Sequence, residues 1–474
     1  MNTLCTDPAR DMKVILGRQR SAFLEEGPPT LSQRRDDLLK LKSLVLGHQE
    51  EIVAALHEDF GHRASHETAI MEVMPLVQAI NYQRSHLRRW MRPEKRSVPM
   101  PFQPGRAWIK HQPLGVVGIM SPWNYPLQLA LLPLATAIAA GNRALIKPSE
   151  YTPATSALLE RMLGQAFGQE QVAVFTGDAA VGQAFAALPF DHLVFTGSTA
   201  VGRSIMKAAS ENLVPVTLEL GGKSPVIVDE GHPIEHAAKS VAYGKLANGG
   251  QICIAPDYVL VPEGQAEAFA SAYDTAVRAL YPAGPTSDNY TSIVNERHYR
   301  RLLGLLDDAR ARGARVVEVG INPGEARQRP HNIAPTVVLG ATQDMAILQE
   351  EIFGPLLPVV TYRGIDEAIG YVNERPRPLA LYFFGSDGPN RRKVLERTTS
   401  GNVTVNNTLM HYAQEDLPFG GVGPSGMGAY HGIEGFKALS HAKGIYQQGR
   451  WNMSGVLRPP FGGVADLVLK LTLR

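Results

Sequence analysis

Residues 192–228 read HLVFTGSTAVGRSIMKAASENLVPVTLELGGKSPVIV, and this stretch decides the fold class. Apolar runs at 192–196, 217–220 and 225–228 predict strands, and the run 201–211 predicts a helix between the first two. Turn residues follow each apolar run. Mostly apolar strands that alternate with helices are typical of a parallel sheet with both faces covered. The stretch therefore predicts an α/β fold.

The same alternation continues on both sides of this stretch. Further strands are expected at 107–111, 116–121, 143–147, 172–175, 258–261, 315–319, 336–339, 357–362, 380–384 and 402–405. We therefore expect two α/β domains that meet near residues 220–256. The first ninety residues have helical spacing instead, and Pro75 predicts a kink or break in a helix around 70–80.

Composition indicates a globular protein of a reducing compartment. The 474 residues suffice for two or three domains, and a net charge of +2 gives no electrostatic reason to expect a nucleic acid or an acidic membrane as partner. Cys5 and Cys253, the two cysteines, do not form a disulfide framework, and the charged N-terminus does not resemble a signal peptide. The longest apolar run, 129–140, contains Pro133 and is shorter than the ~20 residues of a membrane span. We expect a cytoplasmic protein with no membrane span.

Two segments carry side chains suited to nucleophilic chemistry. Cys253 ends GGQIC, where glycines allow a tight turn that exposes a thiol and aims backbone N–H groups at an oxyanion. Glu219 lies between two leucines at a strand end in TLELGGK, and partial desolvation there raises the pKa of a carboxyl and suits it to general-base work. Taken singly, a structural thiol and an exposed strand-end glutamate are the commoner explanations.

Three further segments follow predicted strands. FTGSTAVG (195–202) places a glycine turn before a helix whose N-terminus suits a pyrophosphate, although it lacks the GxGxxG fingerprint. PWNYP (122–126) offers the Asn124 amide to an oxyanion, and KPSE (147–150) offers Lys147 and Glu150 to ribose hydroxyls. Taken alone, each segment could equally be an ordinary loop with no binding role.

Two other patterns are better explained by solvent-exposed side chains than by a binding site. His62 and His66 lie four residues apart, but the pattern is not HExxH and no third ligand is evident, so we expect no metal. The basic run 88–96 includes Glu94 and falls at a predicted helix end, which favours a solvated surface over a nucleic-acid site.

The ordered set of segments resembles the aldehyde dehydrogenase superfamily. PWNYP, KPSE, FTGSTAVG, ELGGKSP, GGQIC, EEIFGP and PFGGVGPSGMG occur in that order, and the resemblance extends from about residue 30 to about 445. CIAPDY and LPFGGVGPSGMGAYHG are similar to the class 3 branch, and DFGHRASHE and LPFDHLVFTGSTAVGR to its bacterial coniferyl aldehyde dehydrogenases.

The resemblance implies the aldehyde dehydrogenase fold and a homodimer. A Rossmann-like coenzyme-binding domain would comprise 1–94 and 114–221, and an α/β catalytic domain 222–425. A small oligomerisation unit would comprise 95–113 and 438–450, and 451–474 would form a C-terminal tail. We expect that tail to cover a substrate entrance or a neighbouring subunit.

The resemblance also implies a mechanism on three residues. Cys253 would attack the aldehyde carbonyl, with Asn124 and the Cys253 backbone N–H holding the oxyanion of the thiohemiacetal. Hydride transfer would leave a thioester, and Glu219 would activate the water that hydrolyses it. Relatives that pass the acyl group to phosphate or coenzyme A typically lack this glutamate, so Glu219 favours hydrolysis over an acyl-transferring reductase.

The implied cofactor is NAD or NADP. Lys147 and Glu150 would bind the adenosine ribose. Ser198, Trp123 and Gly197 would contact the pyrophosphate. Glu351 and Phe353 would hold the nicotinamide ribose and ring. Glu150 mildly favours NAD because a carboxylate near the 2′ position repels the NADP phosphate, but the class 3 branch often accepts both.

The implied substrate is an aromatic aldehyde similar to coniferyl aldehyde, with medium- or long-chain aliphatic aldehydes as the alternative. Tyr125, Met410 and His411 are expected at the pocket entrance.

Overall fold

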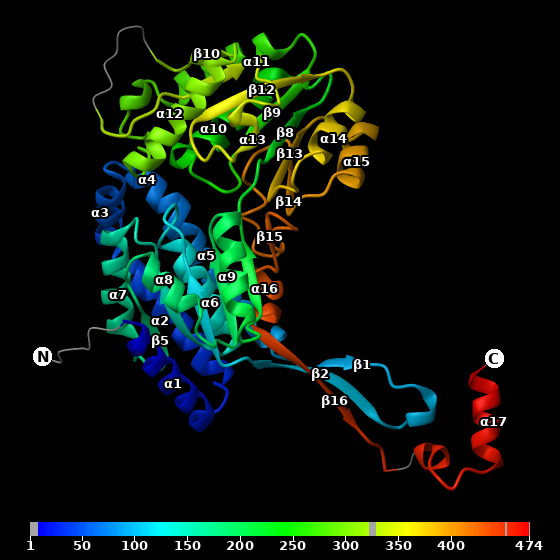
Figure 1. Ribbon diagram of the computed structural model, residues 1–474. Helices are drawn as coiled ribbons and strands as arrows, with labels where there is room; N and C mark the ends of the chain where they lie inside the picture. The colour runs from blue at the N-terminus through cyan, green and yellow to red at the C-terminus, as the bar shows by residue number, and fades with distance from the viewer. Residues whose placement is uncertain (1–7, 322–328, 451–452, 474) are drawn as a thin grey trace, which may run out of the picture.

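Three β-sheets organise the chain. The computed structural model describes residues 8–321, 329–450 and 453–473, so Cys5 and the ends of the N-terminal domain and the tail lie outside the described residues. A six-stranded and a seven-stranded sheet each form the centre of an α/β body, one below the other in Figure 1. A three-stranded sheet projects from the lower body and leads to the C-terminal helix.

The six-stranded sheet belongs to the lower body and has the order β15-β7-β6-β3-β4-β5. It is parallel except for β15, which pairs antiparallel with β7. Its strands are β3 (Val116–Met120), β4 (Arg143–Lys147), β5 (Val172–Val174), β6 (His192–Thr196), β7 (Val216–Glu219) and β15 (Gly426–Met427).

The seven-stranded sheet has the order β10-β11-β12-β9-β8-β13-β14 and is parallel except for β10. Its strands are β8 (Pro225–Val228), β9 (Tyr258–Pro262), β10 (Arg315–Glu318), β11 (Thr336–Leu339), β12 (Leu356–Tyr362), β13 (Ala380–Phe384) and β14 (Asn402–Val405). The sequence predicted the strands of both main sheets to within two residues at each end, apart from β15.

Helices cover both faces of the two main sheets. Those of the lower body are α1 (Pro8–Glu26), α2 (Leu31–Gly47), α3 (Gln49–Phe60), α4 (Ser65–Thr68), α5 (Met74–Trp90), α6 (Gln128–Ala140), α7 (Pro153–Ala166), α8 (Ala179–Ala186), α9 (Thr199–Ser210) and α16 (Gly432–Ala438). Those of the upper body are α10 (Ile234–Leu246), α11 (Ala266–Leu280), α12 (Glu296–Ala311), α13 (Ala346–Gln349), α14 (Ile365–Asn373) and α15 (Pro389–Arg397). Every residue of α6 is buried, as its apolar sequence predicted.

The helix is not broken at Pro75, but its geometry changes directly before it. A π-helical turn, Ala69–Val73, continues directly into α5, and Pro75 lies in the first turn of α5. Proline has no backbone N–H and cannot donate the regular helical hydrogen bond. It is tolerated here because the change of helix type at this position removes the need for that bond.

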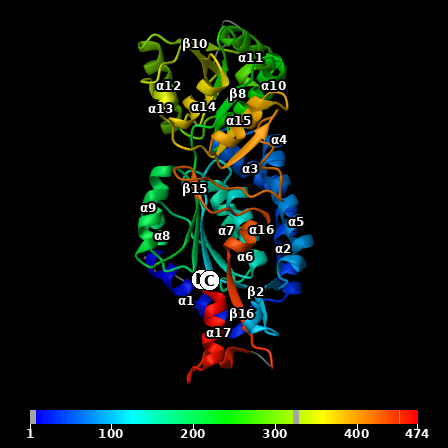
Figure 2. The same cartoon turned by 90° about the vertical axis from the view of Figure 1, so that its right-hand side faces the viewer.

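The projecting arm is a three-stranded antiparallel sheet of β1 (Glu94–Arg96), β2 (Arg106–Pro113) and β16 (Ser440–Gln447). After it the chain forms α17 (Gly463–Thr472), which stands at the end of the arm, away from both bodies, in Figure 1; Figure 2 looks along the arm, so α17 there overlaps the lower body. No helix in the described part of the chain combines the length and the apolar character that crossing a bilayer requires.

The carboxyl ends of the lower strands face the upper body. Lys147 and Glu219 are the last residues of β4 and β7, and the loop that carries Asn124 follows β3. Open parallel sheets bind ligands at this edge. The chain then crosses into the upper body and reaches Cys253 just before β9.

Candidate active site

The turn before Cys253 is built from residues in left-handed conformations. Asn248, Gly249 and Gly250 have φ values of 52°, 61° and 78°. A Cβ on Gly250 would lie 2.4 Å from the carbonyl oxygen of Gly354 and 2.9 Å from that of Lys245. Only glycine therefore fits at Gly250, and its absence of a side chain lets the turn pack against the loop after α13.

Glu219 is enclosed at the end of β7. It is 2% exposed, and neither carboxylate oxygen has a hydrogen-bond partner among the described residues. Burial raises the pKa of Glu219 well above its ordinary value, because no cation or N–H group compensates the charged form. The sequence predicted this shift, although not how completely the carboxyl is enclosed.

The surroundings of the partly buried Cys253 thiol favour its neutral form. Burial raises its pKa above the ordinary value, and the negative charges of Glu351 and Glu219 raise it further. A thiol in such a setting reacts only when a base takes its proton. Glu219 and Glu351 are carboxylates close enough to influence that proton.

Two cavities meet at Cys253 and Glu219, because both residues line each of them. The first is here called the loop pocket. It lies among the loops that follow β3 and β6 and the turn that precedes β12. It is lined by eight of the ten predicted site residues, namely Trp123, Asn124, Gly197, Ser198, Glu219, Cys253, Glu351 and Phe353. The second, here called the apolar pocket, opens beside the helical segment 70–78.

Lys147 and Glu150, the other two predicted residues, do not line the loop pocket. They form an ion pair of 3.0 Å at the carboxyl end of β4, the strand next to β3. Lys147 is buried, and the α8 glycine Gly182 approaches its side chain. The two residues therefore lie at the same sheet edge as the loop pocket, one strand further out.

Glu351 and its neighbours form one wall of the loop pocket. A Cβ on Gly221 would lie 2.2 Å from a carboxylate oxygen of Glu351, so the glycine allows the two segments to touch. Burial, followed by the charge of Asp257, raises the pKa of Glu351 to about 8. The rings of Trp123 and Phe353 meet edge to face with centroids 5.3 Å apart.

Ser198 caps the first turn of α9, where its side chain accepts a hydrogen bond from the Val201 N–H. This helix has 12 residues, so its N-terminus adds a partial positive charge to the wall of the loop pocket. A Cβ on Gly197 would lie 2.5 Å from the Phe195 ring, which explains the glycine before the cap.

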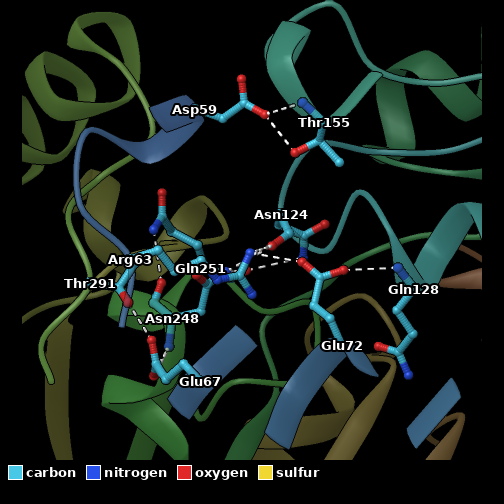
Figure 3. Close-up of polar contacts among 10 residues, drawn as sticks. All are labelled: Asp59, Arg63, Glu67, Glu72, Asn124, Gln128, Thr155, Asn248, Gln251 and Thr291. Atoms are coloured by element: carbon cyan, nitrogen blue, oxygen red, sulfur yellow. Dashed lines mark hydrogen bonds and ion pairs between the residues drawn. The ribbon is translucent and has the colours of Figure 1, made fainter. Parts of the chain in front are cut away.

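Asn124 is fixed on both its side chain and its backbone. Its Nδ2 donates to the backbone carbonyl of Gln251 at 3.0 Å. Its own backbone carbonyl accepts hydrogen bonds from Arg63 Nη1 at 3.2 Å and from Asn248 Nδ2 at 3.0 Å. Figure 3 shows these contacts converging on one loop. The Asn124 amide is therefore held by Gln251, which lies two residues before Cys253 in the chain.

Sequence reasoning did not single out the acidic and basic residues that pack against this loop. Arg63 and Glu72 form a completely buried ion pair of 2.9 Å, and Glu67 accepts hydrogen bonds from the Asn248 N–H at 2.7 Å and from the Thr291 hydroxyl (Figure 3). The signal lay in HRASHETAIME, where charged residues recur on the inward side of a helical segment. Periodicity alone does not show that such a side is buried.

The apolar pocket is lined by residues of both bodies. Tyr125 and Met410 line it, as expected, but His411 does not, which corrects that prediction. His411 is buried instead, and its Nδ1 lies 2.7 Å from the Thr404 hydroxyl. The polar members of an otherwise largely apolar wall include Gln78, Gln128, Thr196, Glu219 and Glu415.

Comparison with known proteins identifies this arrangement. Residues 8–445 match the aldehyde dehydrogenase family. The chain belongs to the aldehyde dehydrogenase family. It is 50% identical over 457 residues to a probable coniferyl aldehyde dehydrogenase of Caulobacter vibrioides, which covers 95% of this chain and 94% of that protein.

Solved aldehyde dehydrogenase structures share the fold. Staphylococcus aureus AldH in a substrate-bound state superposes with a TM-score of 0.91 at 38% identity, over 97% of this chain and 99% of that one. An NAD-dependent aldehyde dehydrogenase from Sinorhizobium meliloti gives 0.84 at 27% identity, over 96% and 89%. This aldehyde dehydrogenase is an enzyme that oxidises an aldehyde with NAD or NADP as acceptor.

Proposed function

We propose that Cys253 is the nucleophile, Asn124 the oxyanion donor and Glu219 the general base of this aldehyde dehydrogenase. The observation that carries the proposal is the meeting of two cavities at Cys253 and Glu219. A cysteine at such a junction can receive an aldehyde from one side and a cofactor from the other.

The reaction would begin when the Cys253 thiol loses its proton to solvent and the resulting thiolate attacks the aldehyde carbon. The carbonyl oxygen then gains negative charge, and the Asn124 amide and the Cys253 backbone N–H would stabilise it. Each such donor is often worth ~3–4 kcal/mol of transition-state stabilisation. NAD or NADP, when bound in the loop pocket, would accept the hydride that leaves the former aldehyde carbon. The thioester on Cys253 would be hydrolysed by a water whose proton passes to Glu219.

Residues of the loop pocket fit a dinucleotide. The N-terminus of α9 suits a pyrophosphate, and Lys147 and Glu150 would bind the adenosine ribose from the next strand. A Glu351 carboxylate oxygen is buried without a hydrogen-bond partner among the described residues, as expected of a group that awaits a ribose hydroxyl. Phe353 would hold the nicotinamide ring from the same turn.

We infer that the substrate is an aromatic aldehyde of the coniferyl type. Its support is the 50% identity to the Caulobacter vibrioides protein, together with an apolar pocket walled by Tyr125, Tyr412 and Phe419. Aliphatic aldehydes are the second candidate, because Ile70 and Met74 at the same pocket are 46% and 45% exposed and offer an apolar path to the surface.

We further propose a cytoplasmic homodimer with the domain division 1–94 and 114–221, 222–425, and 95–113 with 438–450. Support comes from the three separate sheets and from α17, where Leu467, Leu471 and Leu473 are 56%, 69% and 79% exposed. Truncation after Arg458 should change the oligomeric state measured by light scattering, or else the substrate preference. If it changed neither, the proposed role of the tail would be wrong.

The decisive experiment is NAD and NADP reduction by the purified enzyme on cinnamaldehyde-type and aliphatic aldehydes, with Cys253→Ala as control. We expect turnover of the aromatic substrates that the variant loses. Preference for aliphatic aldehydes would keep the mechanism and remove the coniferyl assignment, whereas turnover by Cys253→Ala would contradict the mechanism.

A further inference from the structure

Gln128 carries a buried amide that the reaction described above does not use. The residue is 2% exposed, and its Nε2 is enclosed with no hydrogen-bond partner among the described residues. Its backbone N–H donates to Glu72 at 2.8 Å, and the side chain extends away from that carboxylate (Figure 3). A buried amide nitrogen without a partner destabilises the fold unless a water or a ligand completes its hydrogen bond.

The position of Gln128 places this amide beside the aldehyde route. Gln128 begins α6 four residues after Asn124, and the chain already turns helically there, since the Leu129 N–H donates to the Tyr125 carbonyl at 2.9 Å. Asn124 immediately precedes this turn, so the two side chains lie close together along the chain. Asn124 lines the loop pocket and Gln128 the apolar pocket, so Gln128 reaches the part of a substrate that lies beyond its aldehyde group.

Neighbouring side chains indicate which chemical groups fit the part of the substrate beyond its aldehyde. Met71 and Leu129 offer the same pocket an apolar surface, which fits a hydrocarbon or an aromatic ring. The Tyr125 hydroxyl is also enclosed without a partner among the described residues, and it too lines this pocket. An apolar body with a hydrogen-bonding substituent therefore matches the wall better than a plain hydrocarbon does.

We propose that the Gln128 side chain hydrogen-bonds an oxygen substituent on the ring of an aromatic aldehyde and so sets a preference for oxygenated over unsubstituted substrates. The amide donates to a methoxy or hydroxyl oxygen and accepts from a phenolic O–H. This inference rests on the proposed aromatic substrate and adds the residue that distinguishes among such substrates.

The test is the ratio of kcat/KM for coniferyl aldehyde to that for cinnamaldehyde. Gln128→Met keeps the length of the side chain and removes its hydrogen bonds, so we expect this ratio to fall about fivefold to tenfold. Each ratio is taken within one protein, and a general loss of folded enzyme cancels from it. The same substitution at Gln165, an exposed residue of α7, is the matched control and should leave the ratio at its wild-type value.

Gln128→Leu is a second variant, which also removes the amide donors but has a different apolar shape. It should lower the relative kcat/KM for 4-methoxycinnamaldehyde, whose methoxy oxygen can only accept. Unchanged ratios in both variants would overturn the role of Gln128 while leaving the aromatic assignment in place. If the wild-type enzyme oxidised octanal and neither cinnamaldehyde, the proposed substrate would fail first and the inference with it.

Discussion

The side-chain amide of Asn124 donates a hydrogen bond to the backbone carbonyl of Gln251 at 3.0 Å. This bond joins the loop after β3, in the lower body, to the turn that presents Cys253 in the upper body. Arg63 and Asn248 hold the Asn124 backbone from the other side. The proposed oxyanion donor and the proposed nucleophile are thus positioned by one connected set of hydrogen bonds that crosses between the two bodies.

Glu219→Gln should separate the two halves of the reaction. The first half, through the thioester, would continue, whereas hydrolysis would lose its base and slow by about 10²–10⁴-fold. Rapid mixing with NAD should then show a burst of NADH close to the enzyme concentration, followed by slow turnover. In the wild type, the raised pKa of Glu219 predicts that hydrolysis accelerates as pH rises and the carboxyl loses its proton. A variant with undiminished steady-state turnover would contradict this role.

Gly250→Ala should distort the nucleophile turn. A Cβ there meets two carbonyl oxygens, at 2.4 and 2.9 Å, in a backbone conformation with φ of +78°. Gly313→Ala is the matched control, because Gly313 also has positive φ, +91°, but open space around it. The control should cost about 1 kcal/mol from backbone strain, and Gly250→Ala should cost more and also lower kcat. Equal effects on the free energy of unfolding and on kcat would contradict the packing argument.

Prediction from sequence succeeded where local chemistry sufficed. Strand positions followed from apolar runs. Cys253 and Glu219 were singled out in glycine-rich segments, and the structure places both at the two cavities, but their catalytic roles stay predictions. The burial of Arg63, Glu67 and Glu72 could not be predicted, because it depends on loops more than fifty residues away along the chain. The same limit explains His411, whose neighbour Met410 lines the pocket while His411 turns inward to Thr404.

Glu351 should make the folded protein less stable as pH rises. Its folded pKa of about 8 lies above the value of ~4.3 for an unfolded glutamate. Its contribution to stability is therefore complete below ~4.3 and is lost as pH rises through the folded pKa. Chemical denaturation of the wild type and Glu351→Gln at several pH values between 5 and 9 measures this. The variant should gain stability relative to the wild type as pH rises, and a constant difference would contradict the assignment.

Arg63→Met should impair both folding and positioning, since the arginine pairs with Glu72 and donates to the Asn124 carbonyl. Removing one member of a buried ion pair costs about 3–5 kcal/mol, because the other charge remains desolvated. The double variant Arg63→Met/Glu72→Gln removes that stranded charge and should recover much of the free energy of unfolding. It cannot restore the hydrogen bond to Asn124, so kcat and the rate at which iodoacetamide alkylates Cys253 should stay altered. If both returned to wild-type values together with stability, Arg63 would serve the fold alone, and the idea that it positions Asn124 would be wrong.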